Sequence, residues 1–180
     1  PSGLLLSHIL YLNGIDSIII ERQSKNHVLS RIRAGVLEAG TVQLLRDIGL
    51  GDRMNKEGMP HDGTSITWEG KPSLFIDVKK YTGKTFMAYG QTSITEDLFK
   101  QREIDNGHIF CEASQVAINN IEDRNPEVTF VHDGKTQKIT CDYVAGCDGF
   151  HGVSPHIIPK SCQRSFQRNY PFGWLGIMAE

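Results

Sequence analysis

The spacing of apolar residues near the start of the chain changes from that of a helix to that of a strand. In residues 2–13 leucine and isoleucine recur every three or four positions, with Ser2 placed to cap a helix and Gly14 to end it. Residues 16–21 contain three successive isoleucines, a run typical of a buried parallel strand. Because a helix followed by such a strand forms the second half of a βαβ unit, the pattern predicts an α/β fold with a mainly parallel sheet.

Other segments repeat these two patterns. Helical spacing predicts further helices at 37–48, 52–57 and 92–106, the last with Thr92 as its N-cap, whereas residues 23–35 lack a period and predict a loop. Strands are predicted at 108–111, 116–119, 128–132 and 137–140, the last two joined by Asp133-Gly134. Period-two alternation in 64–68 and 74–78, around the turn signal at 69–72, predicts an antiparallel hairpin.

Both ends of the sequence predict a piece of a longer protein. The chain opens with Pro1-Ser2-Gly3 and runs directly into the first helix without a preceding strand. It stops just after residues 174–178, an apolar run that predicts a strand. We therefore expect the first strand of the fold to lie before Pro1 and further structure to follow residue 180.

Composition and charge argue against several classes of partner. The formal net charge of −2 provides no basic field for a nucleic acid, and the longest apolar runs are far shorter than the roughly 20 residues of a membrane span. The four cysteines are not spaced as metal ligands, which favours reduced thiols and no metal site. These features predict a cytoplasmic protein that binds neither nucleic acid nor membrane.

One motif is suited to a dinucleotide. A helix N-terminus can face a pyrophosphate, and an acidic residue at the end of the next strand can accept a hydrogen bond from a ribose hydroxyl. Here Ser2 and Gly3 open the first helix, and Glu21 follows the isoleucine run. An ordinary helix start with a solvated glutamate would give the same pattern.

Two further segments agree with that interpretation. Arg31 and Arg33 are placed to hold a diphosphate through planar guanidinium groups, and the following Ala34-Gly35 lets a flat ring approach the backbone. Asp148-Gly149 ends an apolar strand and can turn the chain toward a cofactor. A basic loop and a plain turn are the alternatives, but the three signals in this order favour a nucleotide.

Longer strings make the interpretation specific. Across essentially its whole length the chain resembles the FAD-dependent aromatic hydroxylases of the 4-hydroxybenzoate 3-monooxygenase family. The matching strings are residues 20–23, 31–38, 89–92, 141–152 and 170–176. The resemblance implies a Rossmann-like FAD-binding domain in residues 1–60 and 90–170, and strands of an incomplete substrate domain in 61–89 and 171–180.

The family also implies a reaction. Its members reduce FAD with NADPH or NADH, react it with O2, and hydroxylate a small aromatic acid through a flavin C4a-hydroperoxide. The expected substrate is 4-hydroxybenzoate, the expected product is 3,4-dihydroxybenzoate, and the expected assembly of the complete enzyme is a homodimer. A piece lacking the family's substrate-binding residues is expected to be inactive by itself.

Site residues follow from the same resemblance. Those expected to contact FAD are Ser2, Gly3, Glu21, Arg31, Ile32, Arg33, Ala34, Gly35, Val36, Gln91, Asp148 and Gly149. Those expected to bind the pyridine nucleotide are Arg22, Gln23, Arg31 and His151, with Asp148 and Gly149 serving both. His61 matches the histidine at the solvent end of a proton relay to the substrate phenol, and histidine suits that task because it exchanges protons near neutral pH.

Two departures and three alternatives remain. Pro155 stands where relatives carry an NADPH-binding arginine, and His27 where some carry tyrosine, so the choice between NADPH and NADH stays open. The protein could hydroxylate a different phenol, or be an FAD-binding domain without catalysis. An inert gene fragment would also have two cut ends.

Overall fold

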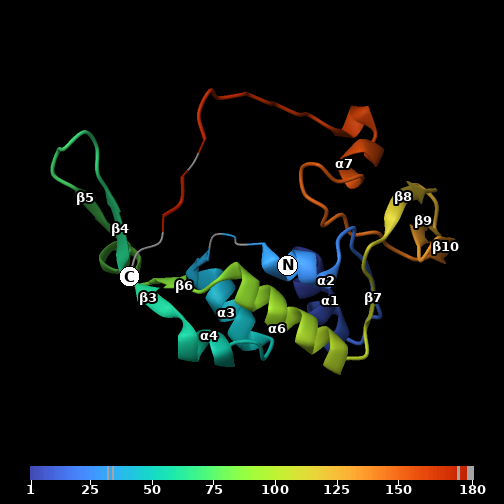
Figure 1. Cartoon of the computed structure of the whole chain (residues 1–180), viewed down its shortest axis with the longest axis horizontal. Coiled ribbons are helices and arrows are strands. Elements are labelled where there is room, and N and C mark those ends of the chain that lie inside the picture. The colour runs from blue at the N-terminus through green and yellow to red at the C-terminus, as the bar shows by residue number, and fades with distance from the viewer. Residues whose placement is uncertain (32, 34, 174, 178–180) are drawn as a thin grey trace.

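The computed structural model of the chain describes residues 1–31, 33, 35–173 and 175–177. Its helices are α1 (Ser2–Leu12), α2 (Lys25–Ser30), α3 (Ala39–Asp47), α4 (Asp52–Glu57), α5 (Val78–Thr82), α6 (Gln91–Ile104), α7 (Ser154–Ile157) and the 3-10 turn η1 (Lys160–Cys162). Its strands are β1 (Ile18–Ile20), β2 (Val36–Leu37), β3 (Met59–His61), β4 (Gly63–Ile66), β5 (Leu74–Asp77), β6 (Phe86–Ala88), β7 (His108–Phe110), β8 (Ser114–Asn119), β9 (Glu127–His132) and β10 (Lys135–Thr140). The predicted α/β class is confirmed (Figure 1).

Strands β1 and β7 form a parallel pair covered by two helices. The pairing joins Ile18 to His108 and Ile20 to Phe110. Leu4 of α1 and Leu98 and Phe99 of α6 form a buried cluster against this pair. The two helices therefore hold the strand ends in place beneath the predicted nucleotide site.

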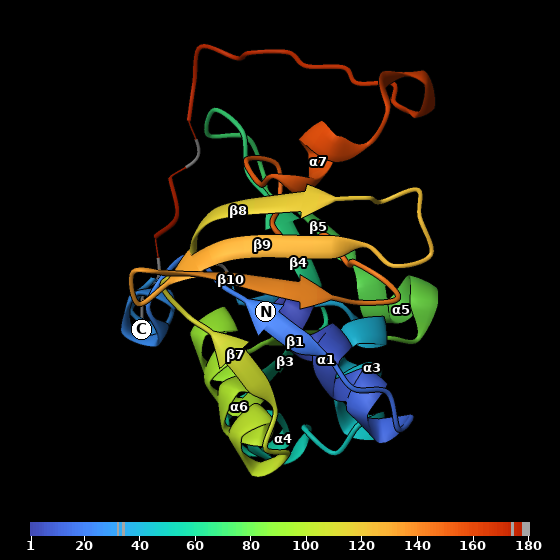
Figure 2. The same cartoon turned by 90° about the vertical axis from the view of Figure 1, so that its right-hand side faces the viewer.

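The prediction of a mainly parallel sheet does not hold for the described residues. Strands β1 and β7 pair in parallel, and the other described pairs are antiparallel. Strands β8, β9 and β10 form an antiparallel meander (Figure 2), because strands joined by short turns can pair only in that direction. Asp133 (φ 50°) and Gly134 (φ 69°) form the turn between β9 and β10, as predicted, and both have the positive φ that a tight hairpin needs. Phe130, 1% exposed, anchors the meander on the body of the protein.

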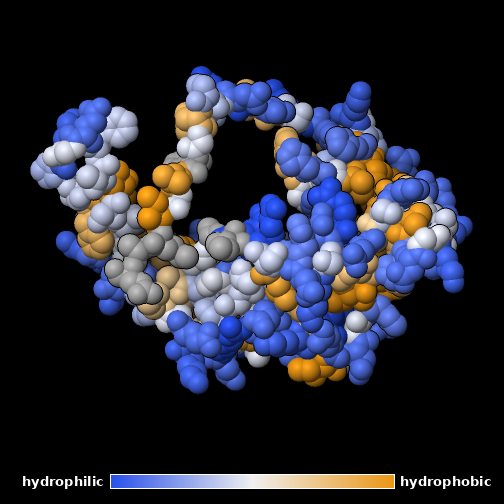
Figure 3. Space-filling view, in the orientation of Figure 1, coloured by the Kyte–Doolittle hydropathy of each residue, from blue (hydrophilic) through white to orange (hydrophobic). Residues whose placement is uncertain are grey.

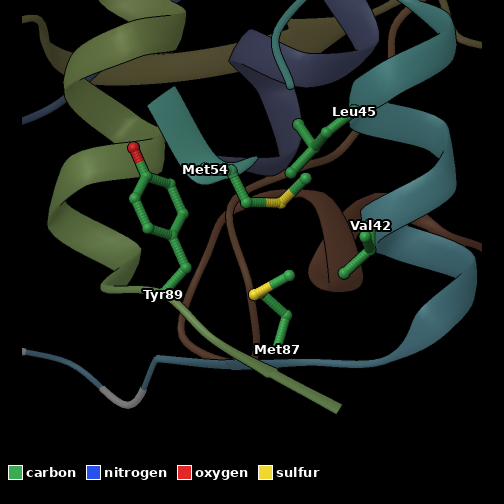
Figure 4. Packing of buried hydrophobic residues seen from close by; sticks show 5 residues of the cluster. All are labelled: Val42, Leu45, Met54, Met87 and Tyr89. Atoms are coloured by element: carbon green, nitrogen blue, oxygen red, sulfur yellow. The ribbon is translucent and has the colours of Figure 1, made fainter. Parts of the chain in front are cut away.

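A second antiparallel sheet, in the order β2–β6–β3, went unpredicted because its strands have only two or three residues each. Val36 of β2 pairs with Ala88 of β6, which also pairs with Met59 of β3. Figure 4 shows the cluster beside this sheet, formed by Val42, Leu45, Met54, Met87 and Tyr89. The sheet and cluster connect the arginine segment 31–36 to α3, α4 and the start of α6.

The predicted hairpin is confirmed as β4 and β5, which Figure 1 shows projecting from the body. Large apolar side chains on it remain exposed, including Trp68 at 65% and Leu74 at 63%.

Several local predictions were wrong. The predicted loop 23–35 contains α2, because the Ser24 side chain accepts a hydrogen bond from the His27 N–H and caps a short helix. The helix predicted from residue 37 begins at Ala39, since Val36 and Leu37 pair as β2.

Two predicted helix caps were also wrong. The N-cap of α1 is Pro1 instead of Ser2, and that of α6 is Gly90 instead of Thr92. Neither predicted side chain bonds its own helix start, because each of the two residues already lies within its helix.

The strand predicted at 174–178 is not formed in its described residues 175–177, which are irregular and exposed; Trp174 and Met178 lie outside the described residues. An isolated segment has no neighbouring strand to satisfy its backbone groups, so the apolar pattern alone does not produce a strand. Residues 164–173 before it are exposed, and Figure 3 shows the chain arching over open space.

Candidate functional site

The carboxyl end of β1 fixes the position of Glu21. Its N–H donates to Phe110 O at 2.8 Å, and its carbonyl accepts from Ala113 N at 3.0 Å. Its side-chain Oε1 accepts a hydrogen bond from Gln23 N at 2.8 Å. The second carboxylate oxygen takes part in no hydrogen bond within the described part of the chain, so it is available to a hydroxyl group.

The start of α1 lies beside the segment that leads to Asp148 and Gly149. A Cβ added to Gly3 would make only an ordinary 3.5 Å contact with Cys147 Cβ, so close packing does not itself require this glycine.

The arginine segment is tied to the start of α6. Arg31 O accepts a hydrogen bond from the Thr92 hydroxyl at 3.2 Å, and Gly35 O accepts from Tyr89 N at 2.7 Å. Arg31 and Arg33 are exposed, whereas the predicted contacts Ile32 and Ala34 lie outside the described residues.

Gly35 marks a close crossing of two backbones. A Cβ at this position would lie 2.8 Å from both Gly90 Cα and Tyr89 O, which is too close for any side chain. Gln91, the first residue of α6, follows directly and is half-buried. The structure thus places Gly35, Val36 and Gln91 at one junction.

Asp148 and Gly149 form a tight turn before α7. Gly149 has a φ of 70°, and Asp148 Oδ2 accepts a hydrogen bond from Ser154 N at 2.9 Å. Desolvation disfavours the charge of Asp148, but hydrogen bonds from Ser154, from the Val153 backbone and from its own backbone together hold the pKa of Asp148 below its usual range. Asp148 is therefore an ionised group that already stabilises its own turn.

The same turn borders a cavity of about 390 Å³. Asp148, Gly149 and Pro155 line it together with apolar side chains that include Ile118 and Val144. The cavity lies between the meander and α7, so the Asp-Gly turn has one face toward an apolar space.

Three predicted residues stand apart from these groups. His61 is exposed on β3 and pairs through its backbone with Phe86. Arg22 is exposed, and so is His151, whose ring stands edge-on to Phe150 at 5.0 Å. None of the three makes a side-chain hydrogen bond or ion pair with another described residue. Their roles stay predictions.

The sequence interpretation missed a polar network behind the junction. Arg53 of α4 donates to Glu96 at 2.9 Å and to Asp97 at 3.0 Å, and Asp97 accepts from the Tyr89 hydroxyl at 2.8 Å. The string 89–92 contained the signal, because a tyrosine beside a glycine at a helix start needs a partner for its hydroxyl when buried.

No cluster of three or more metal-ligating side chains occurs in the described ranges. Among the helices that the structure describes, none is sufficiently long and apolar to cross a membrane.

Comparison with known proteins identifies the family. The family described as "FAD binding domain" matches residues 1–180. The chain is 41% identical, over 181 aligned residues, to p-hydroxybenzoate hydroxylase of Acinetobacter baylyi (strain ATCC 33305 / BD413 / ADP1), covering 100% of this chain and 44% of that protein. It therefore spans less than half the length of this relative.

Solved structures share the fold. p-Nitrophenol 4-monooxygenase PnpA from Pseudomonas putida DLL-E4 superposes with a TM-score of 0.68 at 17% identity, covering 80% of this chain and 37% of that one. CmlS, a flavin-dependent halogenase, superposes with a TM-score of 0.65 at 17% identity, covering 80% and 26%. The matched residues include the whole candidate site, and the chain belongs to the FAD binding domain family.

Proposed function

We propose that this chain is the flavin-binding part of a monooxygenase that uses NADPH or NADH and O2 to convert 4-hydroxybenzoate to 3,4-dihydroxybenzoate. The observation that carries the flavin assignment is the match of the FAD binding domain family to residues 1–180, supported by Glu21 at the end of β1 with one carboxylate oxygen not hydrogen-bonded among the described residues. The substrate assignment rests on the 41% identity to a p-hydroxybenzoate hydroxylase.

The residues present fit FAD. The N-terminus of α1, with Ser2 and Gly3, would face the pyrophosphate, where backbone N–H groups favour an anion. Arg33 would supply charge-assisted hydrogen bonds to the phosphate oxygens, and the free oxygen of Glu21 would accept from the ribose.

The junction of Gly35, Val36 and Gln91 would hold the isoalloxazine ring of FAD. The crossing with Tyr89 and Gly90 fills the space that a side chain of Gly35 would occupy, so the isoalloxazine would lie along the other side of this backbone. Val36 directly follows Gly35 and Gln91 directly follows Gly90, and Asp148 with Gly149 would serve FAD and the pyridine nucleotide. Bound FAD would accept a hydride from the nucleotide and activate O2, while the protein orients the reactants and excludes water.

The pyridine nucleotide would be held at the surface. Arg22, Arg31 and His151 are exposed and Gln23 is half-buried, so charged and polar groups are available to its phosphates. Pro155 is in the first turn of α7 and lines the cavity, where it can donate neither charge nor N–H. We infer a weaker preference for NADPH over NADH than an arginine there would give.

The residues that face the substrate are proposed to lie on the sheet β2–β6–β3. His61 is exposed on β3, two strands from the arginine segment, and would pass protons between solvent and the substrate phenol. Residues 61–89 and 171–180 would belong to a substrate domain that receives the small aromatic acid, and the complete enzyme would be a homodimer.

A direct assay tests the proposal. The full-length protein is purified and its bound flavin is identified by absorbance and mass. NADPH and NADH oxidation are then followed with 4-hydroxybenzoate, 3-hydroxybenzoate and salicylate. We expect FAD to co-purify and 4-hydroxybenzoate to give the fastest oxidation with 3,4-dihydroxybenzoate as product. Bound FAD with no stimulated oxidation by any phenol would contradict the hydroxylase assignment.

One observation keeps a second candidate open. The same fold occurs in CmlS, whose reaction is halogenation, so the fold alone does not determine what the bound flavin does. A related hydroxylase for another phenol would give fast oxidation with that phenol instead. A flavin-binding domain without catalysis would bind FAD yet leave it oxidised when NADPH or NADH is added without oxygen.

A further inference from the structure

Tyr89 connects the arginine segment to a charged network on its far side. Its N–H donates to Gly35 O at 2.7 Å, and its hydroxyl donates to Asp97 Oδ2 at 2.8 Å. The residue is only 5% exposed. One side chain thus joins the backbone that crosses Gly35 to an aspartate in the second turn of α6.

The network fixes Asp97 in turn. Asp97 Oδ1 accepts from Arg53 Nη1 at 3.0 Å, and the same nitrogen donates to Glu96 at 2.9 Å. Hydrogen bonds to Glu96 and Asp97 raise the pKa of Arg53, so the guanidinium stays charged. Both oxygens of Asp97 are therefore occupied, one by α4 and one by Tyr89.

The side chain of Tyr89 points from the apolar cluster toward α6 (Figure 4). Figure 4 shows it beside Met54, with its hydroxyl pointing away from the sulfur atoms and toward α6. Tyr89 is packed in the same buried cluster as Met54, which restricts the direction of its ring. The phenol consequently links the cluster to Asp97 in a fixed direction.

We propose that Tyr89, held by Asp97 and Arg53, is a positioning residue that sets the place of Gly35 and the arginine segment against the flavin. This inference rests on the proposed function, since it requires FAD to lie along that segment. The described residues between Arg31 and Val36 have two tethers besides the β2–β6 pairing, Thr92 to Arg31 O and Tyr89 N to Gly35 O. Without the hydrogen bond from the Tyr89 hydroxyl to Asp97, Tyr89 can shift, and with it the Gly35 carbonyl that its N–H holds.

Tyr89→Phe in the full-length protein tests the proposal. Phenylalanine keeps the ring in the cluster and removes only the hydroxyl, so the protein is expected to fold. We expect the Kd for FAD to rise at least about fivefold, about 1 kcal/mol at 1.4 kcal/mol per tenfold, and the visible absorption band of bound FAD to shift. Asp97→Asn, which keeps the shape but weakens the acceptor, should change both measurements in the same direction.

Gln101→Met is the matched control. Gln101 lies on the same helix and donates to Asp105 at 2.7 Å, so the variant also removes a hydrogen bond to a partly buried carboxylate. A merely structural loss lowers the melting temperature but leaves the molecules folded at 25 °C, so it does not change the Kd of the folded protein. We expect the control to lower the melting temperature and leave the Kd and spectrum unchanged.

The outcomes separate the two proposals. FAD affinity and spectrum unchanged in Tyr89→Phe, or weakened equally in Gln101→Met, would overturn the positioning role while the wild type still binds FAD. A wild-type protein that binds no FAD would overturn the proposed function and, with it, this inference.

Discussion

His8 Nδ1 lies 3.0 Å from Asp105 Oδ2, and the two side chains are 5% and 3% exposed. His8 Nε2 lies 3.0 Å from Ile48 O, a carbonyl that can only accept, so this nitrogen donates. The Nδ1 contact then needs a further proton on one of the two partners. The pair joins α1 to the ends of α3 and α6 behind the parallel strands.

Asp105→Ala should destabilise the fold. It leaves a buried imidazole without its hydrogen-bond partner and the amide of Gln101 without its acceptor, a loss of about 3–5 kcal/mol in the free energy of unfolding. Denaturant unfolding followed by circular dichroism measures it. Glu103→Gln serves as control because the Lys25–Glu103 pair is exposed, and it should cost less than about 1 kcal/mol. Equal losses in the two variants would contradict the account of the buried pair.

Gly35→Ala and Gly40→Ala should act in opposite directions. A Cβ at Gly35 meets backbone atoms at 2.8 Å, so the crossing must open at a cost of about 1–3 kcal/mol. A Cβ at Gly40 meets nothing within 4 Å in α3, and replacing a helical glycine should gain up to about 1 kcal/mol. Thermal unfolding of both variants checks the signs, and a stable Gly35→Ala would show that the two backbones do not cross closely.

The sequence predicted those parts of the fold that local patterns determine. The helices at α1 and α6 and the strands β9 and β10 follow from apolar spacing, and the Asp133-Gly134 turn follows from its residue types. The order of α1, β1 and Glu21 also predicts which end of β1 would face a nucleotide.

The missed parts depend on partners distant in sequence. Strand β2 has two residues and exists only because β6 lies beside it, more than 40 positions later. The link from Tyr89 through Asp97 to Arg53 joins β6, α6 and α4, and no local period reveals it. Long-range pairing and buried polar contacts must be found in three dimensions.

The stability of the protein should fall at alkaline pH because of Tyr89. Burial, followed by the hydrogen bond to Asp97, raises the pKa of Tyr89 above its ordinary value of 10.0. The folded state thus holds the phenol proton more tightly than the unfolded state, so this contribution is complete below pH 10.0 and is lost as pH rises through the folded-state pKa.

Comparison with Tyr89→Phe isolates that effect. The free energy of unfolding is measured in urea between pH 8 and 11 for both proteins. The wild type should lose stability above about pH 10 more steeply than the variant, which has no phenol at this position. Parallel curves for the two proteins would show that Tyr89 does not contribute to the alkaline loss.

Arg33→Ala should weaken FAD retention without unfolding the protein. Arg33 is exposed, in the segment whose backbone is tied to the start of α6. Removing a charge-assisted hydrogen bond to the pyrophosphate should cost about 1.5–3 kcal/mol of binding, or roughly a tenfold to hundredfold rise in Kd. Glu21→Ala should weaken FAD binding less, because its carboxylate would accept a hydrogen bond from the ribose and would not contact the phosphates.

Arg124→Ala separates this contact from the general loss of positive charge. Arg124 is exposed in the connection between β8 and β9, so its removal lowers the net charge equally while leaving the α1 end unchanged. Fluorescence quenching of FAD titrated with each apoprotein gives the Kd values. Since screening by salt reduces only long-range effects, the difference between the Arg33 and Arg124 variants should persist at high ionic strength. Equal FAD affinity in the two variants would place Arg33 away from the diphosphate.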